Sequence, residues 1–199
     1  MITRKEMTRM LLKEGLLSCL ANNSFESVTV TSLCKASGIT RSTFYLHYSN
    51  IMEIVDDLVD DAIAYSKPGM VDNNNLQTIA NTLSAASNSI SLREAYDSIF
   101  DRLPLCQRII RHKKYLPLFL DEQISEYVLQ RIIGREKDRQ GLVMAEALGV
   151  SFDVGVSVFV FLVHGLYAVN KQYKWSQSDE WLEAQKIIFE LVYRGLQSR

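Results

Sequence analysis

The sequence has little of the material that several protein classes require. Its 199 residues include only three cysteines, nine glycines and three prolines. Cys19, Cys34 and Cys106 lie far apart, and none shares a CxxC or metal-ligand spacing with another. We therefore expect neither a disulfide scaffold nor a bound metal. The scarcity of glycine and proline leaves little turn material for a sandwich or barrel of many strands, and it favours helices.

A long hydrophobic run is also lacking. The most apolar stretch, residues 154–169, has 16 residues and contains Ser157, His164 and two glycines. It is shorter than the roughly 20 residues that cross a membrane as a helix. Residues 1–10 lack the unbroken apolar run of a secretory signal. We therefore expect a cytoplasmic protein with no membrane partner.

The chain has no large excess of charge of either sign. Its net charge is −1 and apolar residues make up 47%, ordinary values for a folded domain. The charge is unevenly distributed, however. Residues 1–50 contain six Lys and Arg against three acidic residues, a surplus of +3, whereas residues 51–75 carry a surplus of −5. The positive N-terminal segment indicates where a polyanion would dock.

Signatures of catalysis are missing as well. The sequence shows no Ser/His/Asp order, no paired carboxylates in the context of a pocket and no glycine-rich phosphate loop. We therefore expect no cofactor, no catalytic residues and no enzymatic activity. An enzyme that uses Cys106 or His164 is the alternative, and the sequence offers no catalytic partner for either residue.

What is present is helical periodicity. Leu12, Leu16, Cys19 and Leu20 fall on one face of a helix predicted over residues 3–22. The spacing along the rest of the chain predicts an all-α fold. Further helices are expected over residues 30–37, 41–48, 51–66, 76–102, 104–112, 116–137, 142–171 and 179–197.

Two of these helices are short and adjacent. Thr29 is placed to cap the helix over residues 30–37, and Thr40 is placed to cap the helix over residues 41–48. Gly38 lies between them and can form the sharp turn. Two short helices joined by a tight turn with glycine form a helix-turn-helix.

The clearest linker is residues 67–75, which contain Pro, Gly and three consecutive asparagines. We therefore predict a helix-turn-helix domain over residues 1–50 and a helical regulatory and dimerisation domain over residues 76–199. The helix over residues 51–66, with an acidic outer side, would bridge the two domains.

The segment G-I-T-R-S-T-F-Y-L-H-Y, from Gly38 to Tyr48, resembles the core motif of the TetR family of bacterial transcriptional regulators. The detailed resemblance covers about residues 5–62. It implies an N-terminal three-helix DNA-binding domain and a C-terminal helical domain that binds a ligand and dimerises. It also implies a ligand-responsive regulator, most often a repressor, that binds a palindromic operator as a homodimer. One position departs from the family: Ile51 stands where a phosphate-contacting lysine is common, which weakens anchoring to the DNA backbone.

The residues themselves agree with a DNA-binding helix. Bases are read in the major groove by short polar or bidentate side chains near the N-terminus of a helix. Arg41, Ser42 and Thr43 are such side chains; Arg41 could bind a guanine and Thr43 could offer its methyl group to a thymine. The other predicted DNA-binding residues cap a helix or carry groups suited to phosphate oxygens: Thr29, Thr31, Lys35, Thr40, Tyr45, His47 and Tyr48. The alternatives are that Tyr48 packs on the following helix and that Lys35 and His47 are ordinary solvated residues.

The last helix is apolar over most of its circumference, so it requires burial on two sides. The second side is expected to be a partner subunit, and the resemblance implies a four-helix bundle formed by the last two helices of each subunit. The predicted interface residues are Phe159, Trp181, Ile188 and Val192. A deeply buried core within one chain is the alternative.

Residues 76–170 contain many aromatic side chains and few polar ones to accompany them inside a pocket. This composition predicts a small, mostly apolar effector ligand. The predicted pocket residues are Tyr96, Phe100, Phe119, Tyr127, Phe161 and His164. The alternative function is a helical, dimeric binding module of the same fold that acts through a protein partner without binding an operator.

Overall fold

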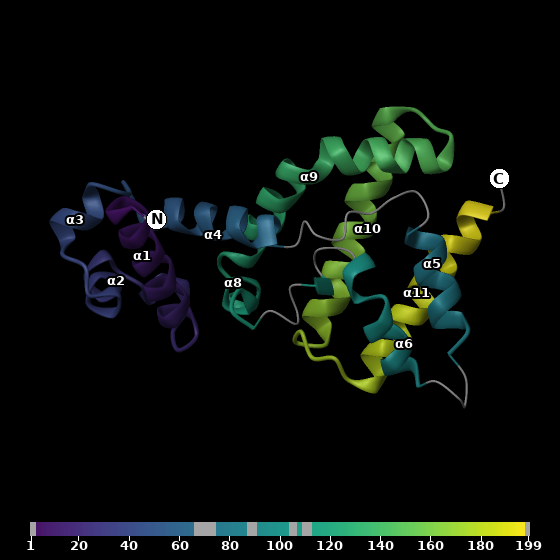
Figure 1. Cartoon of the computed structure of the whole chain (residues 1–199), viewed down its shortest axis with the longest axis horizontal. Coiled ribbons are helices and arrows are strands. Elements are labelled where there is room, and N and C mark those ends of the chain that lie inside the picture. The colour runs from purple at the N-terminus through teal and green to yellow at the C-terminus, as the bar shows by residue number, and fades with distance from the viewer. Residues whose placement is uncertain (1–2, 66–74, 87–90, 104–106, 109–112, 198–199) are drawn as a thin grey trace. The chain divides into compact units, whose positions relative to one another are not determined.

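The structure, a computed structural model, describes residues 3–65, 75–86, 91–103, 107–108 and 113–197 (Figure 1). These residues form helices and no strand, which confirms the predicted all-α fold. The chain divides into two compact units. The first contains Met1–Tyr65 and His112–Gly134, and the second contains Ser66–Arg111 and Arg135–Arg199.

Helix α1 (Arg4–Leu20) opens the first unit, close to the predicted range of 3–22. Thr3 begins it with a capping box: Thr3 Oγ1 accepts from the Glu6 backbone N–H, and the Glu6 carboxylate accepts from the Thr3 backbone N–H. The hydrogen bonds that the backbone N–H and the hydroxyl of Thr3 donate to this carboxylate lower the pKa of Glu6. Leu12, Leu16 and Leu20 are buried on one face of α1, as their spacing predicts.

The next two helices are capped as the sequence predicts. Thr29 Oγ1 accepts from the Ser32 backbone N–H at 3.1 Å, at the start of α2 (Val30–Ser37). Gly38 ends α2 with φ +68°, the left-handed conformation that glycine adopts at no steric cost. Thr40 Oγ1 accepts from the Thr43 backbone N–H at 3.2 Å and begins α3 (Arg41–Tyr45). Helix α3 ends three residues before the predicted limit, and the chain leaves it through a turn.

The rest of the first unit comes from two distant parts of the chain. Helix α4 (Ile51–Tyr65) follows the predicted range. The single helix predicted over residues 116–137 is wrong: it is divided into α8 (Leu116–Leu120) and the beginning of α9 (Ser125–Leu148). The Asp121 carboxylate causes the division, because it accepts from the backbone N–H groups of Gln123 and Ile124 and starts a new helix.

The same segment changes the predicted division of the chain. Asp121 also accepts from the backbone N–H of Phe25, in the short helix η1 (Phe25–Ser27), at 2.7 Å. Leu118 and Phe119 of α8 are buried, and α8 lies against α1. Residues 112–134, which the sequence placed with the C-terminal domain, therefore complete the core of the first unit.

The second unit contains α5 (Asn75–Ser84), α6 (Leu92–Ser98), the short helix η2 (Phe100–Arg102), the remainder of α9, α10 (Phe152–Gln172) and α11 (Asp179–Gln197). Helix α11 begins and ends where the sequence predicts. The helix predicted over residues 76–102 is wrong, because a capping box of Ser91 and Glu94 starts α6 anew. The helix predicted over residues 142–171 is also wrong, since Gly149, at φ +63°, ends α9 before α10 begins. The predicted linker 67–75 and helix 104–112 fall largely outside the described residues, as does Cys106.

Trp181 is the centre of the second unit's core. It is fully buried, its ring packs edge-on against Tyr96 with centroids 5.2 Å apart, and its indole N–H donates to Asn170 Oδ1 at 3.0 Å. A chain of buried hydrogen bonds lies on the same face of α11. The Tyr96 hydroxyl donates to Gln107 Oε1, and Gln107 Nε2 donates to Gln185 Oε1 at 2.9 Å. This core is therefore polar as well as aromatic.

Helix α10 contains the 16-residue apolar run of the sequence. It has 21 residues, because it extends beyond that run at both ends. By length and composition it could cross a membrane, and it is the one helix of the described residues that could. In the second unit it packs one face inward, with Phe159, Leu166, Tyr167 and Asn170 buried. Gly155 on this face meets the backbone of α9, since a Cβ there would lie 2.3 Å from the Gly141 carbonyl oxygen.

Candidate functional site

The surface of α2 and α3 carries most of the predicted site residues. Between residues 27 and 50 the sequence has no acidic side chain, and Lys35 and Arg41 supply positive charge. Seven of the ten predicted DNA-binding residues are exposed in the structure: Thr29, Thr31, Lys35, Thr40, Arg41, Ser42 and Tyr45. Thr43 and His47 are half-buried. The result is an exposed polar surface free of acidic side chains, which we call the α2/α3 surface.

The first turn of α3 is ordered by its own hydroxyl groups. Thr40 Oγ1 lies 3.0 Å from Ser42 Oγ and 2.8 Å from Thr43 Oγ1, in addition to accepting from the Thr43 backbone. Arg41 is the exposed residue between them. Burial raises the pKa of the Cys34 thiol in α2, and the positive charge of Arg41 acts in the opposite direction. The turn is thus held in place before any ligand binds.

Tyr48 is not part of this surface, and its prediction as a DNA-binding residue is wrong. The side chain is only 3% exposed, and its hydroxyl donates to Asp57 Oδ2 at 2.5 Å. The guanidinium of Arg9 lies over the ring, 4.7 Å from its centroid. Burial and the hydrogen bond to Asp57 raise the pKa of Tyr48. Packing on the following helix, the alternative considered for this residue, is what the structure shows.

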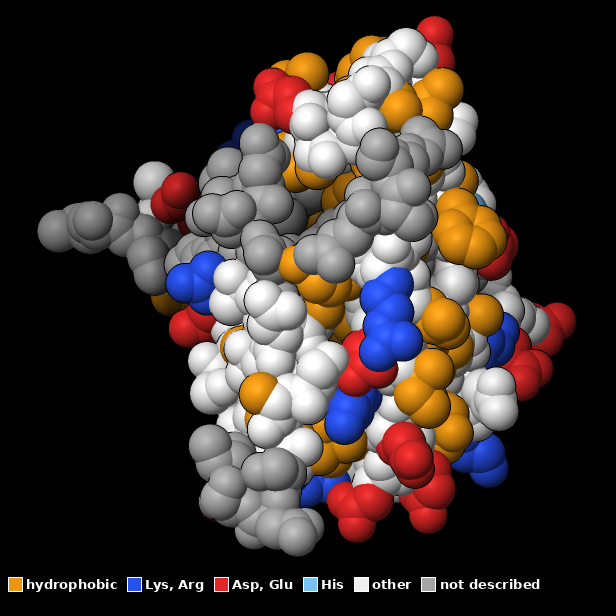
Figure 2. All heavy atoms as spheres, turned by 90° about the vertical axis from the view of Figure 1, so that its right-hand side faces the viewer, with side chains coloured by type: hydrophobic (Ala, Val, Ile, Leu, Met, Phe, Trp, Pro, Cys, Tyr) orange, Lys and Arg blue, Asp and Glu red, His pale blue; other side chains and the backbone are white. Residues whose placement is uncertain are grey.

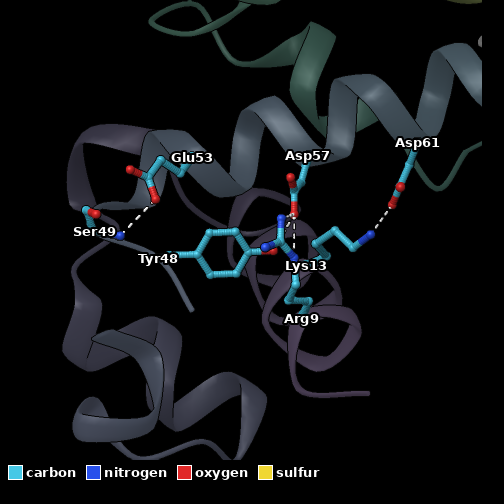
Figure 3. Close-up of polar contacts among 7 residues, drawn as sticks. All are labelled: Arg9, Lys13, Tyr48, Ser49, Glu53, Asp57 and Asp61. Carbon is cyan, nitrogen blue, oxygen red and sulfur yellow. Dashed lines mark hydrogen bonds and ion pairs between the residues drawn. The ribbon is translucent and has the colours of Figure 1, made fainter. Parts of the chain in front are cut away.

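Ion pairs join α1 to α4 beside Tyr48 (Figure 3). Arg9 pairs with Asp57, donating from Nε at 3.1 Å as well as from its terminal nitrogen, and Lys13 pairs with Asp61. The hydrogen bond to Asp57 raises the pKa of Arg9. Two of the six cations in residues 1–50 are therefore neutralised by carboxylates of α4. These pairs were not predicted from the sequence, although both partners recur at a spacing of four residues, which places them on one face of each helix.

These pairs make a testable contribution to stability. We expect Asp57→Ala to lower the free energy of unfolding by about 1–3 kcal/mol, because it leaves the Arg9 guanidinium and the buried Tyr48 hydroxyl without their acceptor. Chemical denaturation followed by circular dichroism measures the change. Asp61→Ala is the matched control, since the Asp61 carboxylate is more exposed than that of Asp57 and its loss should cost no more than about 1 kcal/mol. Equal losses in the two variants would contradict this role of Asp57.

The predicted pocket residues are divided between the two units. Phe119 and Tyr127 belong to the first unit and the other four to the second. Phe119 is buried in the core, and the Tyr127 hydroxyl donates to Asp56 Oδ1 at 2.6 Å. Tyr96 is fixed between Trp181 and Gln107, as described above.

The other predicted pocket residues differ in exposure. Phe161 is 74% exposed, Phe100 is half-buried in η2, and His164 is half-buried with Nδ1 2.9 Å from the Val160 carbonyl oxygen. The ligand pocket therefore stays a prediction. Aromatic content alone does not distinguish a pocket wall from a core, because both exclude water.

The predicted dimer-interface residues differ in their exposure. Trp181 and Phe159 are buried within their own chain, so neither is available to a partner, and Ile188 and Val192 are half-buried. Other hydrophobic residues of α10 and α11 are exposed: Phe152, Val154, Phe161, Ile187 and Leu191. We call Val154, Phe161, Ile187 and Leu191 the α10/α11 apolar face. Figure 2 shows the side of the second unit with α5 and α11, where hydrophobic side chains reach the surface among charged ones.

The fold and the site together define a class: a helical protein with an exposed, capped pair of short helices in one unit and outward apolar side chains in the other. Comparison with known proteins adds no narrower name. No protein-family model matches the chain, and no curated protein matches it at a significant level.

Proposed function

We propose that this protein is a cytoplasmic, ligand-responsive transcriptional regulator, acting as a repressor, that binds a palindromic DNA operator as a homodimer. The observation that carries the proposal is the α2/α3 surface: polar, free of acidic side chains and ordered by its own caps. The resemblance of residues 38–48 to the TetR motif supports the same function. The resemblance also supports an effector ligand, which we propose to be small and mostly apolar.

In this proposal, α2, the turn at Gly38 and α3 act as a helix-turn-helix. Helix α3 enters the major groove, where Arg41 can donate two hydrogen bonds to guanine O6 and N7. Thr29 and Thr31 lie at the N-terminus of α2, where hydroxyl and backbone N–H groups suit a phosphate oxygen. Tyr45 is exposed on α3 and presents its hydroxyl to the DNA backbone. Backbone contacts set the register, and base contacts set the sequence.

The α10/α11 apolar face supports the dimer. Its four exposed side chains would leave water by packing against the same face of a second copy, in a symmetric interface. Phe161 and Leu191 are its most exposed members, at 74% and 66%. A two-fold dimer presents two α3 helices, so the operator should be palindromic, with half-site centres about 34–36 Å apart or a multiple of that.

The test begins with selection of bound duplexes from random DNA. Arg41→Ala should then weaken binding to the selected operator by about 1–3 kcal/mol and relax the base preference at one position of each half-site. Tyr45→Phe is the comparison, since the loss of a phosphate contact should weaken binding to all sequences alike. If Arg41→Ala leaves both affinity and base preference intact, α3 does not read DNA in this way.

A binding module that acts through a protein partner is the second candidate. Two observations favour it: Ile51 supplies no cation at the start of α4, and Tyr45 and Leu46 expose hydrophobic surface on the first unit. The selection experiment separates the two functions. A folded dimer that enriches no duplex from random DNA is the result expected of the binding module.

A further inference from the structure

Leu46 is the most exposed large hydrophobic side chain of the described residues, at 81%. It directly follows α3, and its backbone N–H donates to the carbonyl oxygens of Ser42 and Thr43, at 3.3 and 3.2 Å. The helical turn therefore extends through Leu46. Because residues four apart share a face of a helix, Leu46 lies one turn beyond Ser42 on the same side.

The exposed side of α3 is thus a strip that changes in character along its length. Arg41 and Ser42 form its polar beginning, and Tyr45 and Leu46 form its apolar end. Phe44 is fully buried and holds the opposite side of the helix in the core. In the proposed function the whole strip faces the nucleic acid, so the leucine must meet some part of it.

The chemistry of leucine restricts what that part can be. Its side chain can neither donate nor accept a hydrogen bond, so it gains nothing from phosphate oxygens or from polar base edges. The apolar group that the major groove presents is the C5-methyl of thymine. The absence of acidic residues from 27 to 50 lets the phosphate backbone approach this strip without repulsion, which favours DNA as its occupant.

We propose that Leu46 is a specificity-determining residue that reads the C5-methyl group of a thymine in each half-site of the operator. The inference rests on the proposed function and extends the reading surface beyond Arg41, Ser42 and Thr43. Contact removes the leucine side chain and the methyl group from water together. Cytosine at the same position offers no methyl group, so the contact selects thymine.

The experiment removes the methyl group and nothing else. In the operator obtained by selection, each thymine is replaced in turn by deoxyuridine, and the Kd is measured for the wild type and for Leu46→Ala. One methyl group is worth about 0.8 kcal/mol when buried, a factor of about four in Kd. We expect one thymine position at which deoxyuridine weakens wild-type binding about fourfold, and about 15-fold when both half-sites are changed. Leu46→Ala should lose this sensitivity at that position.

Two further variants make the result specific. Leu120→Ala alters another exposed leucine of the first unit, in α8, and should keep the full sensitivity to deoxyuridine. Leu46→Met keeps a flexible apolar side chain and should retain most of the sensitivity to deoxyuridine. A thymine read by the methyl group of Thr43 stays sensitive in Leu46→Ala, which separates the two contacts. Leu46 is too exposed to support the core, so Leu46→Ala should unfold at the same temperature as the wild type.

The outcomes separate this inference from the function on which it rests. If a duplex is selected and Leu46→Ala shows the same sensitivity to deoxyuridine as the wild type at every thymine, the role of Leu46 is overturned and the proposed function stands. If no duplex is enriched, the proposed function and the inference are overturned together.

Discussion

Trp181→Ala is expected to lower the free energy of unfolding of the second unit by about 3–5 kcal/mol. The substitution removes a fully buried indole, its edge-on contact with Tyr96 and the donor to Asn170 Oδ1. Such a loss is a large fraction of the stability of a typical domain. Chemical denaturation followed by far-ultraviolet circular dichroism measures it. Trp175, the other tryptophan of the chain, reports the same transition by fluorescence.

A more conservative series separates packing from hydrogen bonding. Trp181→Phe keeps an aromatic ring and removes only the larger ring system and its N–H donor. Within the described residues the Asn170 side-chain N–H group already has no acceptor, so this variant leaves the whole amide without a partner. An unpaired buried amide costs about 1–3 kcal/mol. Combining Trp181→Phe with Asn170→Leu should recover part of that loss. A double variant less stable than Trp181→Phe would show that the unpaired amide of Asn170 does not cause the loss of stability.

The second large effect is expected at the α10/α11 apolar face. Ile187→Glu combined with Leu191→Glu should convert the proposed dimer to a monomer, because four carboxylates would meet across a symmetric interface. Ile187 and Leu191 are 50% and 66% exposed, so the chain itself should remain folded. A monomer engages one half-site at a time. Its operator affinity should therefore fall by a factor of about 100 or more.

Two measurements and one control test this prediction. Sedimentation gives the oligomeric state, and titration with the selected operator gives the affinity. Leu120→Glu is the control, because it places one carboxylate at an exposed leucine of the first unit and should leave the dimer intact. A double variant that stays dimeric would show that the subunits meet elsewhere. A monomer that binds the operator as tightly as the wild type would show that tight binding does not require dimerisation.

The elements that could be predicted from the sequence are those fixed by neighbouring residues. Thr29, Gly38 and Thr40 make hydrogen bonds or turns within four residues of the chain, so their roles followed from local spacing. The helix breaks at Asp121 and Gly149 were not predicted, because the pattern of apolar residues hides them. Apolar residues continue with helical spacing on both sides of each break, and the periodicity alone gives one long helix.

The candidate site could be predicted only where neighbouring residues in the sequence determine whether a side chain is exposed. Tyr48 is buried because Arg9 and Asp57, which come from two other helices, surround it. Its own neighbours in the sequence do not show this. Helix α11 has apolar side chains on two sides, and the sequence does not indicate which side faces the core. The structure turns Trp181 inward and Leu191 outward, which moves the expected interface by one residue.

The ion pairs between α1 and α4 also determine how binding would respond to salt. Each phosphate that a protein cation neutralises releases condensed counterions, so the logarithm of the affinity falls with the logarithm of the salt concentration by about 0.9 per contact. Arg9 and Lys13 are already neutralised by Asp57 and Asp61 and would release few counterions. Binding should then depend less on the entropy of released ions and more on contacts at base edges. Such a protein would keep its discrimination between sequences at ionic strengths that dissociate a more basic one.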